Sequence, residues 1–257
     1  MSAIPPSAHL FILTGASRGM GLAMAEQLLR RGHTLVCISR GANPQLDAIA
    51  QASSAALHQW PQDLAQGAQA AHKLQDWLAA QGPATFASAA LINNAGVIPR
   101  IAPLSASDAD DLAHALRVGL EAPMQLTAAF LGATEAWDVP RKVLNISSGL
   151  GRRAMASQAA YCAAKAGMDH FTRCVALDEA AKPHGAKVCS LAPGVIDTDM
   201  QVQLRGAAPE DFPDLQNFTR LKAGGQLASP QDAAARVLAW LDRADFGAHP
   251  VADVRDA

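Results

Sequence analysis

The sequence predicts a single α/β domain over residues 1–257, in which a mainly parallel sheet is flanked by helices. Short apolar runs that suit buried strands alternate with stretches of helical periodicity. The first of these runs leads through a glycine-rich turn into a helix, and no repeat, linker or second domain interrupts the alternation. Together these observations are typical of a doubly wound, Rossmann-type fold.

The composition argues against several classes of function. A balance of 21 basic and 23 acidic residues, without a block of like charge, predicts no nucleic-acid and no membrane partner. No apolar stretch approaches about 20 residues, so we expect no membrane span. The eight histidines form no ligand grouping, which predicts no metal. The cysteines form no Cys-x-x-Cys pair and indicate reduced thiols in a cytoplasmic protein: Cys37, Cys162, Cys174 and Cys189.

The first candidate site is the turn at residues 14–21, between an apolar run at 10–13 and a helical pattern. Gly15, Gly19 and Gly21 allow a tight turn and a close approach to a pyrophosphate. The helix that follows offers free N–H groups and the positive end of its dipole. The segment therefore predicts a dinucleotide site.

The second strand, expected at residues 34–38, ends in Ser39 and Arg40 instead of an acidic residue. An acidic side chain here accepts a hydrogen bond from a ribose 2′-hydroxyl, whereas arginine suits a 2′-phosphate. Arg18, in the glycine-rich turn, can hold the same phosphate from the other side. This pattern favours NADP(H) over NAD(H), and the alternative is two solvated surface arginines.

The alternation continues with expected strands at residues 56–60 and 89–92, separated by a helix at about 66–81. Small residues follow the second of these strands at 93–96 and allow close passage of a cofactor. A long helical stretch begins at about Ser105, with a possible capping box from Ser105 to Asp108 and an expected kink at Pro123.

The centre of the sequence is a predicted strand at residues 142–147 followed by Ser148, Tyr161 and Lys165. Tyr161 and Lys165 are four residues apart in an alanine-rich helix, so both side chains emerge on one face. A nearby ammonium lowers the pKa of a phenol, and a hydroxyl at Ser148 can hold a carbonyl oxygen. The alternative is a core ring beside a lysine that reaches solvent.

The last part of the chain predicts a strand at residues 186–191, a turn at 192–198 and a helix that opens at Ser229 and Pro230. A final strand is expected within 249–254. Residues 199–225 carry apolar side chains without a steady period, and we interpret them as a mobile lid over an apolar pocket. The alternative is that this segment is an ordinary surface loop without a role as a lid.

Taken together, these motifs resemble those of the short-chain dehydrogenase/reductase family over nearly the whole chain. The resemblance rests on the glycine-rich turn, the Asn93–Gly96 segment, Ser148, the Tyr161 and Lys165 pair, and the Pro193-Gly194 turn. It implies a catalytic role for Ser148, Tyr161 and Lys165. It also implies that these residues bind the cofactor: Gly15, Ser17, Arg18, Gly19, Met20, Gly21, Arg40, Asp63, Leu64, Asn94, Ala95, Gly96, Tyr161, Lys165, Pro193, Gly194, Ile196 and Thr198.

Within this family the chain looks most like the sepiapterin reductase and benzil reductase group, on the segments at residues 161–163, 191–200, 221–227 and 246–253. The resemblance implies reduction by NADPH of a small hydrophobic ketone or vicinal dicarbonyl. It implies a homodimer or homotetramer. It also implies that Ser148, Leu150, Tyr161, Met200 and Asp253 contact the substrate. Asp256 is an alternative to Asp253 for this contact, and a further alternative is that the carboxylate near the end of the chain is solvated and contacts no substrate.

Gly119 is a departure from the family pattern, which places an asparagine here to hold a water that links the active-site lysine to solvent. We expect activity to survive this change, but it motivates an alternative function as an NADP(H)-binding sensor or scaffold without turnover. A methyltransferase on a related fold would have no use for Ser148, Tyr161 and Lys165 together. Arg152 and Arg153, in the loop after Ser148, are expected to face solvent, and contact with an acidic group of the substrate is the alternative.

Overall fold

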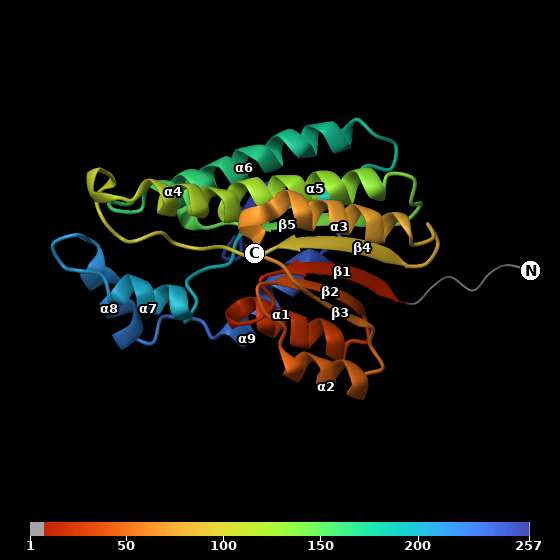
Figure 1. Cartoon of the computed structure of the whole chain (residues 1–257), viewed down its shortest axis with the longest axis horizontal. Helices are drawn as coiled ribbons and strands as arrows, with labels where there is room; N and C mark the ends of the chain where they lie inside the picture. The colour runs from red at the N-terminus through yellow and green to blue at the C-terminus, as the bar shows by residue number, and fades with distance from the viewer. Residues whose placement is uncertain (1–7, 257) are drawn as a thin grey trace, which may run out of the picture.

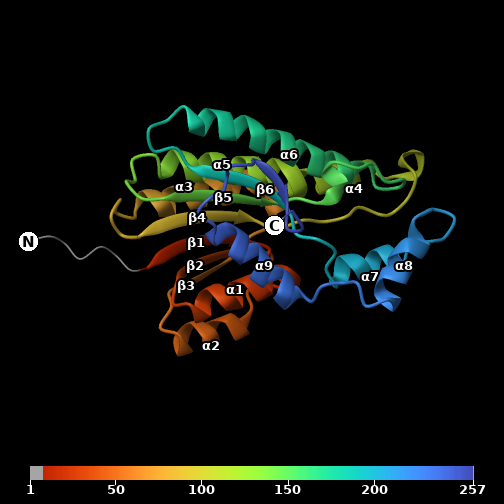
Figure 2. The ribbon, with the colours of Figure 1, turned by 180° about the vertical axis from the view of Figure 1, so that it is seen from behind.

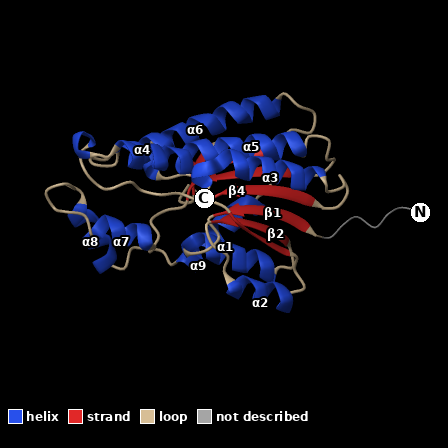
Figure 3. Ribbon diagram, in the orientation of Figure 1, coloured by secondary structure: helices blue, strands red, loops and turns tan. Residues whose placement is uncertain are grey.

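The computed structural model describes residues 8–256 and contains one seven-stranded parallel sheet in the order β3-β2-β1-β4-β5-β6-β7. Helices cover both faces of this sheet (Figure 3), so the predicted doubly wound fold is confirmed. The strands are β1 (His9–Thr14), β2 (Thr34–Ser39), β3 (Leu57–Pro61), β4 (Ser88–Asn93), β5 (Arg141–Ile146), β6 (Lys187–Ala192) and β7 (Val251–Asp253).

The two helical layers lie on opposite sides of the sheet (Figures 1 and 2). One layer contains α3 (Gly67–Ala79), α4 (Ala109–Leu116), α5 (Ala122–Ala133) and α6 (Ala159–Ala180), and the other contains α1 (Gly19–Arg30), α2 (Pro44–Ala52) and α9 (Pro230–Asp242). Along β1, Leu10 and Ile12 pack toward the first layer, whereas Phe11 and Leu13 pack toward the second. Because both faces are buried, the strand is apolar at consecutive positions. No helix within residues 8–256 is long and apolar enough to cross a membrane.

The segment at residues 199–225 contains two helices, α7 (Asp199–Arg205) and α8 (Leu215–Ala223). They lie beyond the carboxyl ends of the strands (Figure 1). The sequence showed no steady period here because both helices are short and bury few side chains, with Leu204 and Phe218 the main apolar ones. The segment is therefore largely helical, and its role as a mobile lid stays a prediction.

The start of α4 differs from the prediction. Asp108 is the N-cap, and its carboxylate accepts hydrogen bonds from the backbone N–H groups of Asp110 and Asp111. Ser105 lies in a separate 3-10 turn, Leu104–Ala106, so the capping box from Ser105 is wrong. An aspartate at Asp108 satisfies two free N–H groups by itself.

The expected irregularity at Pro123 occurs one turn earlier, as a π-helical turn at Arg117–Glu121. Pro123 is near the beginning of α5 and has no N–H group to donate to the preceding turn. The extra residue of the π-helical turn accommodates that missing hydrogen bond between α4 and α5.

A chain of buried amides and hydroxyls joins the sheet to α5 and α6 near the carboxyl ends of the strands. Nδ2 of Asn93 donates to Oδ1 of Asn145 at 2.8 Å and to Oγ1 of Thr127 at 3.2 Å. Nδ2 of Asn145 donates to Oγ1 of Thr172 at 2.9 Å. All four side chains are buried, so each depends on the others for its hydrogen bonds.

We expect Asn145→Ala to lower the free energy of unfolding by about 2–3 kcal/mol, because it removes a partner from both Asn93 and Thr172 in a buried site. Urea denaturation measures this loss. Asn217→Ala, at an exposed position of α8, is the matched control and should change stability by less than about 0.5 kcal/mol. Equal losses in the two variants would contradict a special role for the buried chain.

Candidate active site

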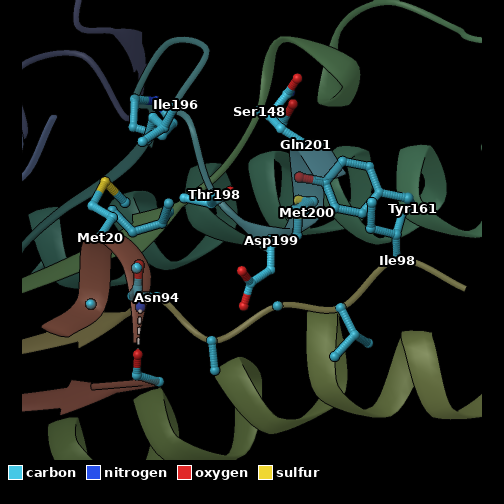
Figure 4. A pocket seen from close by; sticks show the side chains of 18 of the residues that line it. Met20, Asn94, Ile98, Ser148, Tyr161, Ile196, Thr198, Asp199, Met200 and Gln201 are labelled. Atoms are coloured by element: carbon cyan, nitrogen blue, oxygen red, sulfur yellow. Dashed lines mark hydrogen bonds between the residues drawn. The ribbon is translucent and has the colours of Figure 1, made fainter. Parts of the chain in front are cut away.

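The predicted site residues all line one cavity of about 1240 Å³ at the carboxyl ends of the strands. It extends from the glycine-rich turn, past Ser148 and Tyr161, to the helices α7 and α8. Figure 4 shows Met20 and Asn94 toward one side of this cavity and Tyr161 with Ile98 toward the other. The structure therefore brings together segments that are as much as 238 residues apart, from Gly15 to Asp253. No group of three or more potential metal ligands occurs among residues 8–256.

The glycine-rich turn joins β1 to α1 and has a shape that only glycine allows. Gly15 and Gly19 have φ angles of 70° and 56°, in the left-handed region that side chains disfavour. A Cβ on Gly21 would collide with the carbonyl oxygen of Gly15 and come within 2.5 Å of Nδ2 of Asn94. The backbone is thus packed closely around an open cradle at the beginning of α1, which fits a pyrophosphate.

Asn94 holds this turn from the neighbouring strand. Its Nδ2 donates to the carbonyl oxygen of Thr14 at 3.0 Å, and its backbone N–H donates to Oγ1 of Thr14 at 2.9 Å. Oγ1 of Thr14 also accepts from the N–H of Ala95 at 2.9 Å. Asn94 therefore fixes the ends of β1 and β4 side by side.

The two predicted phosphate-binding arginines have different surroundings. Arg40 is exposed directly after β2 and lines the cavity. Nη1 of Arg18 lies 3.1 Å from a carboxylate oxygen of Asp199, the first residue of α7. Both partners of this ion pair are largely exposed, so the pair contributes little stability.

Asp63, the acidic residue after β3, lines the cavity and also makes a hydrogen bond to the backbone. Asp63 accepts a hydrogen bond from the N–H of Ala65 at 2.9 Å and caps a short 3-10 turn, Leu64–Gln66. This cap holds Leu64, which is buried, against the wall of the cavity.

Ser148, Tyr161 and Lys165 come from two elements that meet at this edge. Ser148 follows β5 and caps a 3-10 turn, where its hydroxyl accepts from the N–H of Leu150 at 3.2 Å. Tyr161 and Lys165 are one turn apart on α6. Nζ of Lys165 is buried, donates to the carbonyl oxygen of Ile146 at 2.7 Å and lies 5.7 Å from the centre of the Tyr161 ring.

The pKa values of this pair differ from the prediction. Burial raises the pKa of Tyr161 to about 12, although interaction with the Ser148 side chain lowers it. Burial also lowers the pKa of Lys165 to about 8, and the charge of Asp169 opposes that change. The four-residue spacing predicted a lowered phenol pKa, but desolvation is the dominant effect on Tyr161, and Nζ of Lys165 is directed at the carbonyl oxygen of Ile146.

The far end of the cavity is apolar. Tyr161, Met155 and Met200 pack against a buried cluster that includes residues of α7, α8 and the loop after β4: Ile98, Ile101, Leu204, Phe212 and Phe218. Two buried amides also line this end. Nε2 of Gln158 and Oε1 of Gln201 have no hydrogen-bond partner within the described part of the chain, and an unpaired buried amide atom is costly.

At the end of the chain, Asp253 lines the cavity and Asp256 does not. The carboxylate of Asp253 is 2.6 Å from a guanidinium nitrogen of Arg255, and this hydrogen bond holds the pKa of Asp253 below its usual value. Asp256 accepts from the backbone N–H of Asp253 at 3.2 Å. The structure therefore favours Asp253 over Asp256 as the cavity residue.

Arg152 is exposed, as expected, but it also has partners within the protein that the sequence did not predict. Nε of Arg152 lies 3.5 Å from the buried carboxylate of Asp169, and its Nη2 donates to the carbonyl oxygen of Ala252 at 3.0 Å. Arg153 is exposed, as expected. The sequence analysis also missed Asp169, although it follows Tyr161 and Lys165 at helical spacing.

Gly119, the departure from the family pattern, lies in the π-helical turn against α6. A Cβ added to Gly119 would come within 3.2 Å of the Cβ of Ala164, beside Lys165. A larger residue would require the two helices to move apart slightly. The close helix contact thus leaves little room for a side chain at this position.

Comparisons with known proteins agree with this geometry. A family model described as short chain dehydrogenase matches residues 9–208. Benzil reductase ((S)-benzoin forming) from Bacillus cereus is 36% identical over 235 residues, which cover 91% of this chain and 94% of that protein. Sepiapterin reductase from Xenopus tropicalis is 29% identical over 252 residues, which cover 91% of both. A crystal structure of a metagenomic short-chain oxidoreductase in complex with NADP has a TM-score of 0.71 and 26% identity, and the match covers 97% of this chain and 96% of that one.

The chain therefore belongs to the short-chain dehydrogenase/reductase family, whose members are oxidoreductases that use nicotinamide cofactors. The resemblance to the benzil reductase and sepiapterin reductase group is confirmed. These relatives support an enzyme that acts on a carbonyl or alcohol group of a small molecule.

We expect Gly21→Ala to lower the free energy of unfolding by about 2 kcal/mol or more, because the new methyl group would overlap the Gly15 carbonyl. Chemical denaturation measures the change. Gly41→Ala is the control, since no atom lies within 4 Å of its added Cβ, and it should change stability by less than about 0.5 kcal/mol. A harmless Gly21→Ala would show that the turn is not packed as described.

Proposed function

We propose that the protein is an NADPH-dependent carbonyl reductase that acts on a small hydrophobic ketone, preferably a 1,2-dicarbonyl of the benzil or sepiapterin type. The observation that carries this proposal is the convergence of Ser148, Tyr161 and Lys165 on a cavity that also contains a glycine cradle. A reductase needs both features in one space, because the reacting carbonyl must reach the nicotinamide.

The cradle at Gly15, Gly19 and Gly21 fits a dinucleotide, since these glycines let the turn fold closely against β1 and leave the beginning of α1 open to a pyrophosphate. Bound there, the nicotinamide cofactor supplies the hydride. Arg18 and Arg40 would hold a 2′-phosphate, Asp63 and Leu64 would flank the adenine, and Ile196 and Thr198 would touch the nicotinamide amide. The remaining cofactor contacts would come from Ser17, Met20, Asn94, Ala95, Gly96, Pro193 and Gly194, with Tyr161 and Lys165 at the ribose.

Ser148 and Tyr161 act on the carbonyl oxygen of the substrate. Their hydroxyls donate hydrogen bonds to this oxygen and stabilise the negative charge that develops on it. Tyr161 then delivers the proton. Burial raises the pKa of Tyr161 to about 12, so the phenol is protonated and holds the proton that the reduction requires.

Substrate preference follows from the apolar end of the cavity. Leu150 and Met200 supply apolar contacts, and Asp253, which also lines the cavity, supplies a carboxylate. The buried amide of Gln158, three residues before Tyr161, has an N–H group free to donate to a second oxygen. An apolar cavity with such a donor suits a dicarbonyl better than a simple ketone. We also propose that α7 and α8 act as the lid over this end.

Pairing into a homodimer or homotetramer is supported by exposed apolar side chains on three helices of one layer: Leu116 on α4, Met124 on α5 and Leu177 on α6. Burying such side chains between copies is favourable. A cytoplasmic location stays a prediction from the pattern of cysteines.

The central test is NADPH oxidation with benzil, sepiapterin and a simple monoketone. We expect turnover that is fastest with a dicarbonyl, and Tyr161→Phe should lower kcat by about 10²-fold or more because it removes the proton donor. The matched control is Cys174→Ala, at an exposed position of the same helix, which should retain turnover.

NADPH binding by the unmodified protein without oxidation on any of the three substrates would contradict this proposal. That outcome would favour the alternative function, an NADP(H)-binding sensor or scaffold. Gly119→Asn would then test whether the asparagine of the family pattern restores turnover. Because the new side chain would press against Ala164, this variant should also lose some stability.

Cofactor choice is tested by Arg40→Ala. We expect the KM for NADPH to rise by about 10-fold or more, because a charge-assisted contact to the 2′-phosphate is lost. The KM for NADH should stay within about 2-fold. Arg30→Ala, an exposed arginine on α1 paired with Glu26, is the control and should change neither value. An equal effect on both cofactors would argue against a phosphate contact at Arg40.

A further inference from the structure

Asp169 is a buried carboxylate directly behind the active site, with 2% of its surface exposed. It follows Lys165 by one turn of α6. Its Oδ1 accepts hydrogen bonds from Oγ of Ser147 and from Oγ of Ser190, each at 2.6 Å. One oxygen atom therefore joins α6 to the carboxyl ends of β5 and β6, and Ser147 is the residue before Ser148.

The second oxygen of Asp169 faces the loop after Ser148. Nε of Arg152 lies 3.5 Å from Oδ2, and Arg152 also binds the carbonyl oxygen of Ala252 in β7. A Cβ on Gly151 would come within 2.7 Å of Oδ2, so only glycine lets the loop approach this closely. The carboxylate thus connects the loop, three strands and the catalytic helix.

Asp169 and Lys165 are one turn apart on α6, so the charge of the carboxylate favours the ammonium form of the lysine. Burial lowers the pKa of Lys165 to about 8, and Asp169 is the group that raises it. Arg152 faces Asp169 from the other side and partly neutralises it. Other titratable groups on the elements packed around this region include Tyr161 and Cys162 on α6, Arg153 on the loop, His114 on α4, Arg117 on the π-helical turn, Cys189 on β6 and Asp253 on β7.

We propose that Asp169 is a positioning residue that holds the Ser148 end of β5 against α6 and keeps Lys165 in its ammonium form. Through Lys165 it supports the ribose contact and the proton delivery of the proposed function. Only this last step rests on the proposed function. The contact with Ser147 and the charge state of Lys165 are properties of the protein itself.

The direct test is the titration of Lys165 in Asp169→Asn, followed by carbon NMR of the lysine ε-carbons. The Lys165 signal is assigned by its loss in Lys165→Arg. Asparagine retains an oxygen that can accept from Ser147 and Ser190 but has no charge. We expect the midpoint of the Lys165 titration to fall by about one pH unit or more, because a nearby opposite charge has been removed.

Two further variants separate charge from structure. Asp178→Asn removes an exposed carboxylate from the same helix and should leave the Lys165 midpoint within about 0.2 pH units. Arg152→Gln removes the cation that partly neutralises Asp169, so the midpoint should stay constant or rise. If Asp169→Asn does not fold, Arg152→Gln still tests the proposal, because a fall in its midpoint would overturn it.

The activity readout is the pH profile of kcat/KM for the preferred dicarbonyl. The ammonium form of Lys165 is lost as pH rises through its pKa, so the alkaline limb of the profile reports this group. In Asp169→Asn the limb should move to lower pH by the same amount as the NMR midpoint. An unchanged NMR midpoint overturns the role of Asp169, whereas absence of turnover in the unmodified protein overturns the proposed function alone.

Discussion

The pairing of β1 with β4 is the constraint on which the rest of the structure depends. The chain runs outward from β1 to β2 and β3, and then returns to the opposite side of β1 with β4. At this reversal the loops that follow β1 and β4 diverge toward opposite faces, which opens a crevice at the carboxyl ends of the strands. The glycine-rich turn, Asn94 and Ser148 all reach the cavity because of this single reversal.

Buried polar groups make the same edge rigid. The Asn93, Asn145 and Thr172 chain joins β4, β5 and α6, and Asp169 joins α6 to β5 and β6. Each of these groups is satisfied only while the strands and helix stay in register. Hydrogen bonds between buried groups thus hold this edge of the sheet in addition to the apolar layers on both faces.

Local patterns in the sequence predicted most of the fold and the central part of the site. Strand and helix periodicity located every strand, and the four-residue spacing of Tyr161 and Lys165 placed both on one face of α6. Properties that depend on contacts between distant segments were not predictable in this way. The anchoring of Arg152 by Asp169 and Ala252 requires the loop to meet β7, and the raised pKa of Tyr161 requires knowledge of its burial.

The exposed ion pair between Arg18 and Asp199 can open at little cost, because both side chains are largely exposed. Arg18 lies beside the cradle, whereas Asp199 begins α7, which carries Met200 and Gln201 at the apolar end. Under the proposed function, Arg18 would exchange the carboxylate of Asp199 for the 2′-phosphate. The two ends of the cavity would then be joined by one side-chain contact before the cofactor binds and would be separate afterwards.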